Sequence, residues 1–67
     1  MISARNQFKG VVKSVKLGGV MAEVVVTVGE LEIISAITRI SAEMLGLKAG
    51  DEVKTIIKST EVLIDKP

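Results

Sequence analysis

Two short segments of this sequence concentrate side chains that donate hydrogen bonds or carry positive charge. The first, Ser3-Ala4-Arg5-Asn6-Gln7, offers a hydroxyl, a guanidinium, carboxamides and backbone N–H groups in one extended stretch. The second, Lys58-Ser59-Thr60, offers an ammonium and two hydroxyls at an expected turn, where backbone N–H groups can converge into an anion-binding concavity. Each segment also has an ordinary explanation, because a chain end can fray and Ser-Thr turns are common.

Taken together, the two segments suit a tetrahedral dianion such as molybdate, tungstate or sulfate. Such an anion presents only acceptor oxygens near neutral pH, so its ideal host supplies donors alone: arginine, lysine, hydroxyl and backbone N–H groups. Hydrogen phosphate carries a proton that needs a hydrogen-bond acceptor in the site, so a pocket with donors alone discriminates against it. Neither segment contains Asp or Glu, as this logic requires.

The rest of the composition argues against catalysis. The chain has no His and no Cys, so the commonest general base, the thiolate nucleophile and the usual transition-metal ligands are missing. The acidic residues are scattered, and the one adjacent pair, Asp51-Glu52, falls in an expected turn. No phosphate-binding glycine-rich motif occurs, since Gly18-Gly19 is too short for one. We expect a binding protein that is not an enzyme and has no direct protein–metal ligands.

Valine and isoleucine dominate the segments that must position these donors, and they favour β-strands. Gly10 marks an expected bulge or bend, because the alternation of apolar residues changes to the other face of the strand there. Gly29-Glu30 makes a tight turn between two strands. A short helix is expected between the third and fourth strands, with Ser41 as its N-cap, Glu43 in its first turn and Gly46 at its end. The five expected strands cover residues 7–16, 20–28, 31–38, 52–58 and 61–64.

This order of elements predicts an all-β fold, a five-stranded OB-like barrel with one short helix between strands 3 and 4. The 67 residues suffice for a single domain, 1–67, which buries only about 60% of the surface of its unfolded chain. Hydrophobic residues make up 48% of the chain, yet Phe8 is its one aromatic residue and there is no disulfide. So many aliphatic residues have two possible explanations, a large hydrophobic core or a homo-oligomer. We favour the homo-oligomer, because so small a barrel has few interior positions.

The charge and hydropathy of the sequence limit which binding partners and which cellular location we expect. The net charge is +1 with acids and bases interspersed, so no global field attracts nucleic acid. The N-terminus has no apolar signal region, and the run Val24–Val26 is far short of the roughly 20 residues that a membrane span needs. We therefore expect a cytoplasmic protein with no membrane or nucleic-acid partner. An OB-like module that binds nucleic acid is an alternative, but Phe8 alone is a poor stacking platform.

The sequence resembles the molbindin or molybdopterin-binding-protein (Mop) family, whose unit is a single TOBE-type domain. The resemblance lies in the opening from Ser3 to Val12 and in the second half, where Leu45–Val53 is followed by Ile57–Val62. It covers nearly the whole chain, from Ser3 to Ile64. The S-A-R-N-Q opening and the K-S-T-x-V closing are specific in combination, whereas the L-K-x-G-D-x-V turn recurs in unrelated β-domains.

The resemblance implies a molybdate- or tungstate-binding protein that stores or buffers the oxyanion at subunit interfaces of a hexamer, arranged as a trimer of dimers. It implies that one subunit contacts the anion through Ser3, the backbone of Ala4, and Arg5. A neighbouring subunit would contribute Lys58, Ser59 and Thr60. Asn6 would be a further ligand or would brace the loop to which it belongs. No organic cofactor is expected, because a pterin has no aromatic platform here. An anion-responsive regulatory subunit of a larger assembly is the other alternative.

Overall fold

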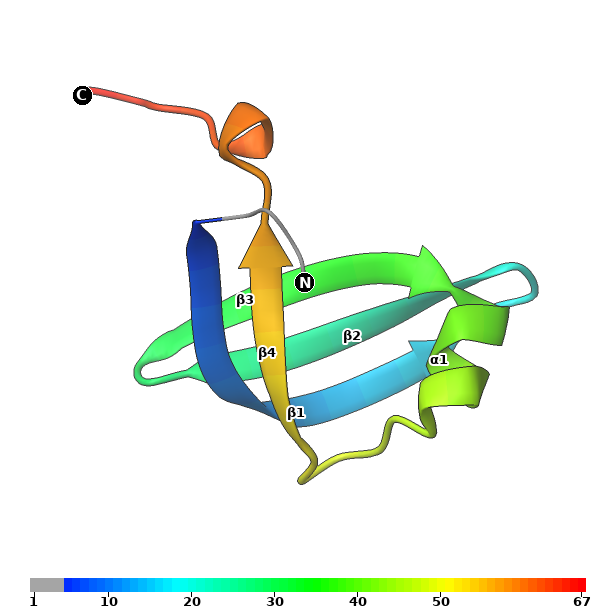
Figure 1. The fold of residues 1–67 in the computed structure, drawn as a ribbon. Helices are drawn as coiled ribbons and strands as arrows, with labels where there is room; N and C mark the ends of the chain where they lie inside the picture. The colour runs from blue at the N-terminus through cyan, green and yellow to red at the C-terminus, as the bar shows by residue number, and fades with distance from the viewer. Residues whose placement is uncertain (1–4) are drawn as a thin grey trace.

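The valine- and isoleucine-rich segments form an antiparallel sheet, and a single short helix lies at one end of it (Figure 1). The computed structural model describes residues 5–67. The sheet has four strands in the order β3-β2-β1-β4, so β3 and β4 are its two edges. The elements in chain order are β1 (Asn6–Leu17), β2 (Met21–Val28), β3 (Leu31–Thr38), α1 (Arg39–Leu45), β4 (Glu52–Ile57) and a 3-10 turn, η1 (Ser59–Glu61).

Strand β1 is long and bent, and its two halves pair with different neighbours (Figure 1). Residues 6–11 pair with β4, whereas residues 11–17 pair with β2. The bend falls near Gly10, where β2 comes so close that a Cβ atom would lie 2.6 Å from the carbonyl oxygen of Thr27. The expected bend at Gly10 is therefore present. The register irregularity is elsewhere, between Val12 and Ser14, where one extra residue increases the local bend of the strand.

The core lies on the inner, concave face of this bent sheet. Alternate residues of β2 are buried there, and Val24 and Val26 pack with Val12 of β1. The alternation of buried and more exposed residues along β2, beginning at Ala22, follows from the period of two in a strand, which turns successive side chains to opposite faces. Ala42 of α1 is the remaining buried apolar residue within 5–67. So small a core leaves many large aliphatic side chains at the surface.

Helix α1 begins earlier than the sequence suggested. Thr38, not Ser41, is the N-cap, because the Thr38 hydroxyl accepts a hydrogen bond of 3.1 Å from the Ser41 N–H. Glu43 therefore lies beyond the first turn, where it pairs with Arg39 (Nε–Oε1 3.0 Å) one turn back. Gly46 ends the helix with φ of 62°, as predicted. Within residues 5–67, no helix is long and apolar enough to cross a membrane.

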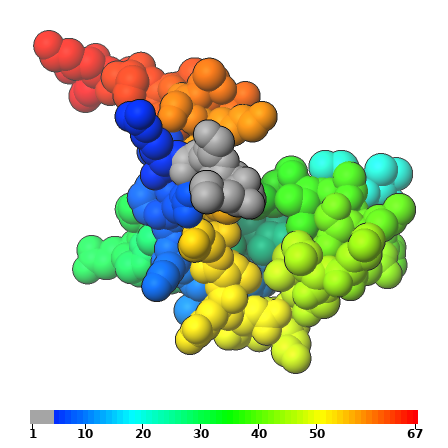
Figure 2. Space-filling model, viewed as in Figure 1, coloured from blue at the N-terminus to red at the C-terminus, as the bar shows by residue number. Residues whose placement is uncertain are grey.

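The mainly β fold with its helix between β3 and β4 is confirmed, but the predicted fifth strand at 61–64 is wrong. Glu61 closes η1, and residues 62–67 form no regular element. Val62 has extended dihedral angles, yet a strand also needs a hydrogen-bonding neighbour, and the tail leads away from the body of the sheet (Figures 1 and 2). The sheet consequently stays open between its two edges, β3 and β4.

Candidate functional site

The register of β1 and β4 brings the two donor-rich segments to one end of the sheet. Asn6 at the start of β1 pairs with Ile57 at the end of β4. Arg5 therefore lies beside the turn that begins at Lys58, although the two residues are far apart in the sequence. Asn6 is half-buried in the same strand pair. Ser3 and Ala4, the other residues expected at this site, lie outside the described residues.

The turn after β4 holds its backbone through two hydrogen bonds. The Glu61 N–H donates to the carbonyl of Lys58 at 2.9 Å, and the Val62 N–H donates to that of Ser59 at 3.4 Å. The hydroxyls of Ser59 and Thr60 are exposed, and neither has a hydrogen-bond partner within residues 5–67. The predicted turn at 58–60 therefore exists, and it leaves its side-chain donors available to a ligand.

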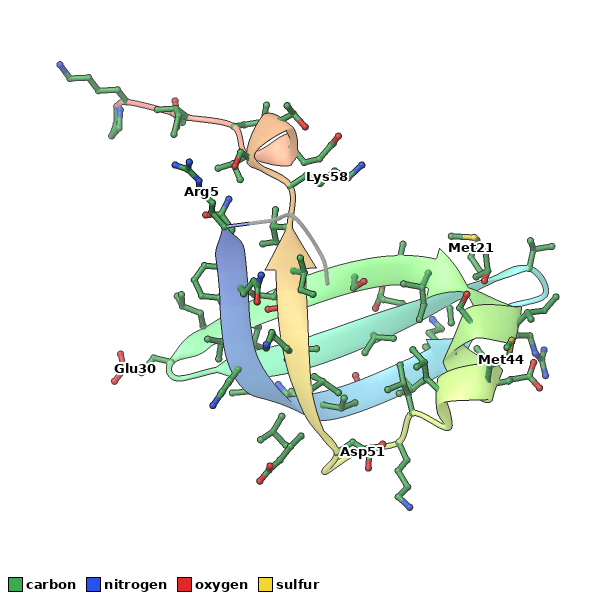
Figure 3. All side chains as sticks on the ribbon, viewed as in Figure 1. Arg5, Met21, Glu30, Met44, Asp51 and Lys58 are labelled. Carbon is green, nitrogen blue, oxygen red and sulfur yellow. The ribbon has the colours of Figure 1, made fainter. Side chains whose placement is uncertain are left out.

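The two cations at this end of the molecule point in different directions. Figure 3 shows the Arg5 side chain projecting from the start of β1 on one side and the Lys58 side chain projecting on the other. Both are exposed, and neither forms an ion pair within the described part of the chain. One chain thus places both cations at the same end, but it does not aim them at a common point.

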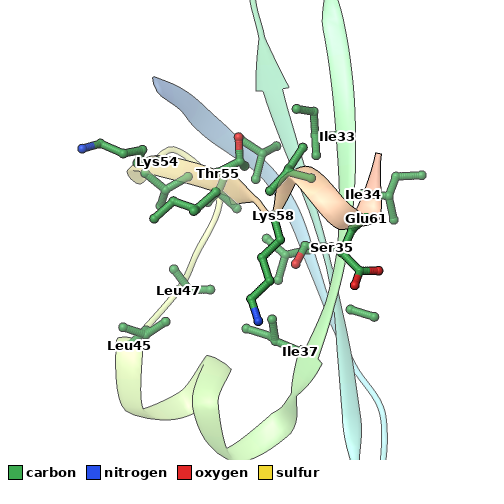
Figure 4. Close-up of a pocket in the computed structure, with 17 residues that line it drawn as sticks. Ile33, Ile34, Ser35, Ile37, Leu45, Leu47, Lys54, Thr55, Lys58 and Glu61 are labelled. Carbon is green, nitrogen blue, oxygen red and sulfur yellow. The ribbon is translucent and has the colours of Figure 1, made fainter. Parts of the chain in front are cut away.

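A groove opens next to this turn, and no pattern in the sequence pointed to it directly. It lies between the edges β3 and β4, with a volume of about 710 Å³. Its walls are mostly apolar: β3 contributes Ile33 and Ile37 (Figure 4), and β4 contributes Val53 and Ile57. Its floor is the valine core, because Val12, Val24 and Val26 are among its lining residues.

Lys58 and Glu61 are the charged residues that line the groove at its η1 end (Figure 4). Glu61 is the carboxylate nearest in sequence to the donors, one residue beyond Thr60, and it was not among the expected site residues. The chemistry of this end of the molecule is therefore that of hydrogen-bond donors and cations with one carboxylate at the rim. Within residues 5–67, no group of three or more His, Cys, Asp or Glu residues could hold a metal ion.

The comparisons with known proteins agree with this chemistry. Residues 2–64 match the TOBE domain family. Molybdenum-pterin-binding protein 3 of Clostridium pasteurianum is 52% identical over 64 residues, which cover 94% of each chain. A molybdate-binding protein of Sporomusa ovata has a solved structure with a TM-score of 0.94, 38% identity and 98% coverage of both chains.

A third protein resembles this chain over part of its own length. The cytoplasmic molybdate-binding protein ModG, solved with molybdate bound, gives a TM-score of 0.84 at 44% identity. The match covers 87% of this chain and 42% of the ModG chain. From the family match, the end-to-end identity and the shared fold, this chain belongs to the TOBE domain family, in the group of small molybdenum-pterin-binding proteins.

Proposed function

We propose that this protein binds molybdate or tungstate in sites divided between copies of itself, and that it stores or buffers the oxyanion in the cytoplasm. Relatives that match it over nearly their whole length are molybdenum-pterin-binding or molybdate-binding proteins. ModG, which is cytoplasmic, holds molybdate. These relatives are binding proteins, and the chemistry of this chain favours binding over catalysis as well.

The observation that carries the proposal is the position of two donor groups at one end of the sheet, neither of which has a side-chain hydrogen bond or ion pair within residues 5–67. Arg5 and the turn Lys58-Ser59-Thr60 supply a guanidinium, an ammonium and two hydroxyls. Charge-assisted hydrogen bonds from such groups are about twice as strong as neutral ones. A dianion that accepts at all its oxygens uses every one of these donors.

The divergence of the two cations supports a site shared between subunits. In the proposed arrangement, the segment Ser3-Ala4-Arg5 of one chain contacts one side of the anion, with Ala4 acting through its backbone. Lys58, Ser59 and Thr60 of a neighbour contact the other side. Asn6 braces the loop that carries Arg5. Binding of this kind couples the anion to assembly, since the complete site exists only between chains.

Exposed apolar side chains support the homo-oligomer. Ile40 and Met44 on α1 are 70% and 83% exposed, and Leu63 and Ile64 in the tail are 93% and 88% exposed. Monomeric proteins rarely leave contiguous apolar patches of this kind in water. The groove between β3 and β4 adds further apolar surface. We propose a hexamer built as a trimer of dimers, which needs two different interfaces on each chain.

The ligand in this proposal is the oxyanion rather than a pterin. A pterin ring would need an aromatic or similar flat surface to stack on, and Phe8 is the sole aromatic residue of the chain. Phe8 is also 40% exposed in β1 and stands alone in the strand. Molybdate and tungstate have nearly the same size and charge, so the donor set assigns no preference between them.

A calorimetric titration with molybdate, using sulfate and phosphate as comparison anions, tests the proposal. We expect tight molybdate binding by a hexamer, and the double variant Arg5→Gln with Lys58→Gln should weaken it at least about a hundredfold, because each charged hydrogen bond contributes roughly 1.5–3 kcal/mol. Lys48→Gln is the matched control, since Lys48 is exposed and lies outside the site. Unchanged molybdate affinity in the double variant would show that the site lies elsewhere.

A further inference from the structure

Glu61 ends the turn that carries the proposed anion donors. It is the last residue of η1 and follows Thr60 directly. Its N–H donates to the carbonyl of Lys58 at 2.9 Å, so a backbone hydrogen bond holds Glu61 beside the donors. The side chain of Glu61 is exposed, and it forms no hydrogen bond or ion pair within residues 5–67.

The carboxylate of Glu61 is the one group of this turn whose charge opposes an anion. Glu61 and Lys58 both line the groove, whereas Ser59 and Thr60 between them do not (Figure 4). An ionised carboxylate offers acceptor oxygens only. It therefore has no hydrogen bond to give to an oxyanion, and its negative charge repels one.

The backbone keeps this charge close to any anion that the turn holds. Consecutive Cα atoms lie about 3.8 Å apart, which places the Glu61 carboxylate roughly 8 Å from an anion bound by the hydroxyls of Ser59 and Thr60. Across that distance in water, repulsion between a carboxylate and a dianion lowers the affinity about fivefold at low salt. We propose that Glu61 sets the affinity of the site, because its charge holds molybdate binding below the level that the donors alone would give.

This inference rests on the proposed function, since it places the anion at Ser59 and Thr60, and it adds a dependence on the charge of the anion. A dianion carries twice the charge of a monoanion of the same shape, so Glu61 repels it with twice the free energy. Perrhenate is such a monoanion, tetrahedral with four acceptor oxygens and a single negative charge. Glu61 thus weakens molybdate more than perrhenate, and it keeps bound molybdate releasable, as a store or buffer requires.

The variant Glu61→Gln removes the charge and keeps both the side-chain length and the backbone hydrogen bond to Lys58. Molybdate affinity is measured by calorimetric titration, and perrhenate affinity by competition with molybdate, at about 10 mM ionic strength, where the Debye length is about 30 Å. We expect molybdate affinity to rise about fivefold and perrhenate affinity about twofold, because the factor for the monoanion is the square root of the factor for the dianion. In about 1 M salt, where the Debye length is about 3 Å, the variant should bind molybdate as the wild type does.

Glu52→Gln is the matched control, because it removes the same charge from the opposite end of β4. Glu52 is exposed and lies roughly 20 Å from Lys58, at about 3.3 Å per residue of strand. Neither anion should gain more than about 1.5-fold in affinity from this change at low salt. Circular dichroism and light scattering establish that each variant keeps the fold and the mass of the wild type.

The outcomes separate this inference from the proposed function. Unchanged molybdate affinity in Glu61→Gln would overturn the inference. Equal gains for the two anions would also overturn it, because Glu61 would then act by pairing with Lys58 or through assembly and not by repelling the anion. Either result leaves the proposed site standing, provided that the double variant of Arg5 and Lys58 loses molybdate affinity. If that double variant binds as the wild type does, the site lies elsewhere and both proposals are wrong.

Discussion

Replacing Gly10 by alanine should destabilise the fold, because Gly10 is the glycine whose added Cβ would meet the most atoms closer than 3.0 Å. The added Cβ would lie 2.6 Å from the Thr27 carbonyl oxygen, 2.8 Å from Cγ1 of Val26 and 2.9 Å from Cγ2 of Val28. The valine side chains belong to or pack against the core, and the carbonyl belongs to β2 itself, so no flexible group can simply move aside. Overpacking of this kind costs about 1–3 kcal/mol, and we expect the upper end because backbone must shift.

That loss is large for a chain of this length. A domain of this size has a total stability on the order of 3–10 kcal/mol, so Gly10→Ala should remove a third or more of it. The melting temperature should fall by roughly 10–20 °C, followed by circular dichroism at fixed protein concentration without molybdate. Gly19→Ala is the matched control, because a Cβ added there would meet nothing within 4 Å and its φ is not positive. A Gly10→Ala protein that melts within about 3 °C of the control would refute the close-approach argument.

Four further predictions follow from the described contacts. Thr38→Ala should cost about 1 kcal/mol in urea unfolding, because the N-cap hydrogen bond to the Ser41 N–H is lost, and an unchanged midpoint would contradict it. Gly46→Ala should cost about 1 kcal/mol, since φ of 62° strains any residue with a Cβ; the same unfolding series checks this. Molybdate at about a hundred times its dissociation constant should raise stability by roughly 2.7 kcal/mol, seen as a higher melting temperature that sulfate does not reproduce. Leu63→Ser with Ile64→Ser should shift the mass measured by light scattering toward the monomer and weaken molybdate binding with it; a hexamer that survives both changes would exclude the tail from the interfaces.

The parts of the fold that the sequence predicted are those set by local rules. The valine-rich composition identified the second strand, and the glycines at positions 29 and 46 marked a turn and a helix end, because both positions have positive φ. The helix start was missed because Thr38 and Ser41 are both good N-caps, and the choice between them depends on where β3 leaves the sheet. The tail at 61–64 has the composition of a strand, but composition does not supply the neighbouring strand that hydrogen bonding requires.

The residue types of the candidate site could be predicted from the sequence, but the way the fold arranges their side chains could not. The donor residue types and their absence of carboxylates could be read from the two segments, and the resemblance to a family joined them. The pairing of Asn6 with Ile57 is a long-range contact that no local pattern reveals. The directions of the Arg5 and Lys58 side chains, and the groove that Lys58 lines, follow from the bend of β1 and the openness of the sheet, which depend on the whole fold.

The pairing of β1 with β4 also bears on when the site can form during folding. The hairpins of β1 with β2 and β2 with β3 join segments adjacent in sequence, so they can close early. Strand β4 must wait for the intervening helix and turn before its residues reach the first half of β1, and loop closure over that distance carries the larger entropic cost. Arg5 and Lys58 are therefore brought to the same end of the sheet only in the last step. Because each proposed site combines Arg5 of one chain with Lys58 of another, oxyanion binding requires completed folding of every contributing chain and then their assembly.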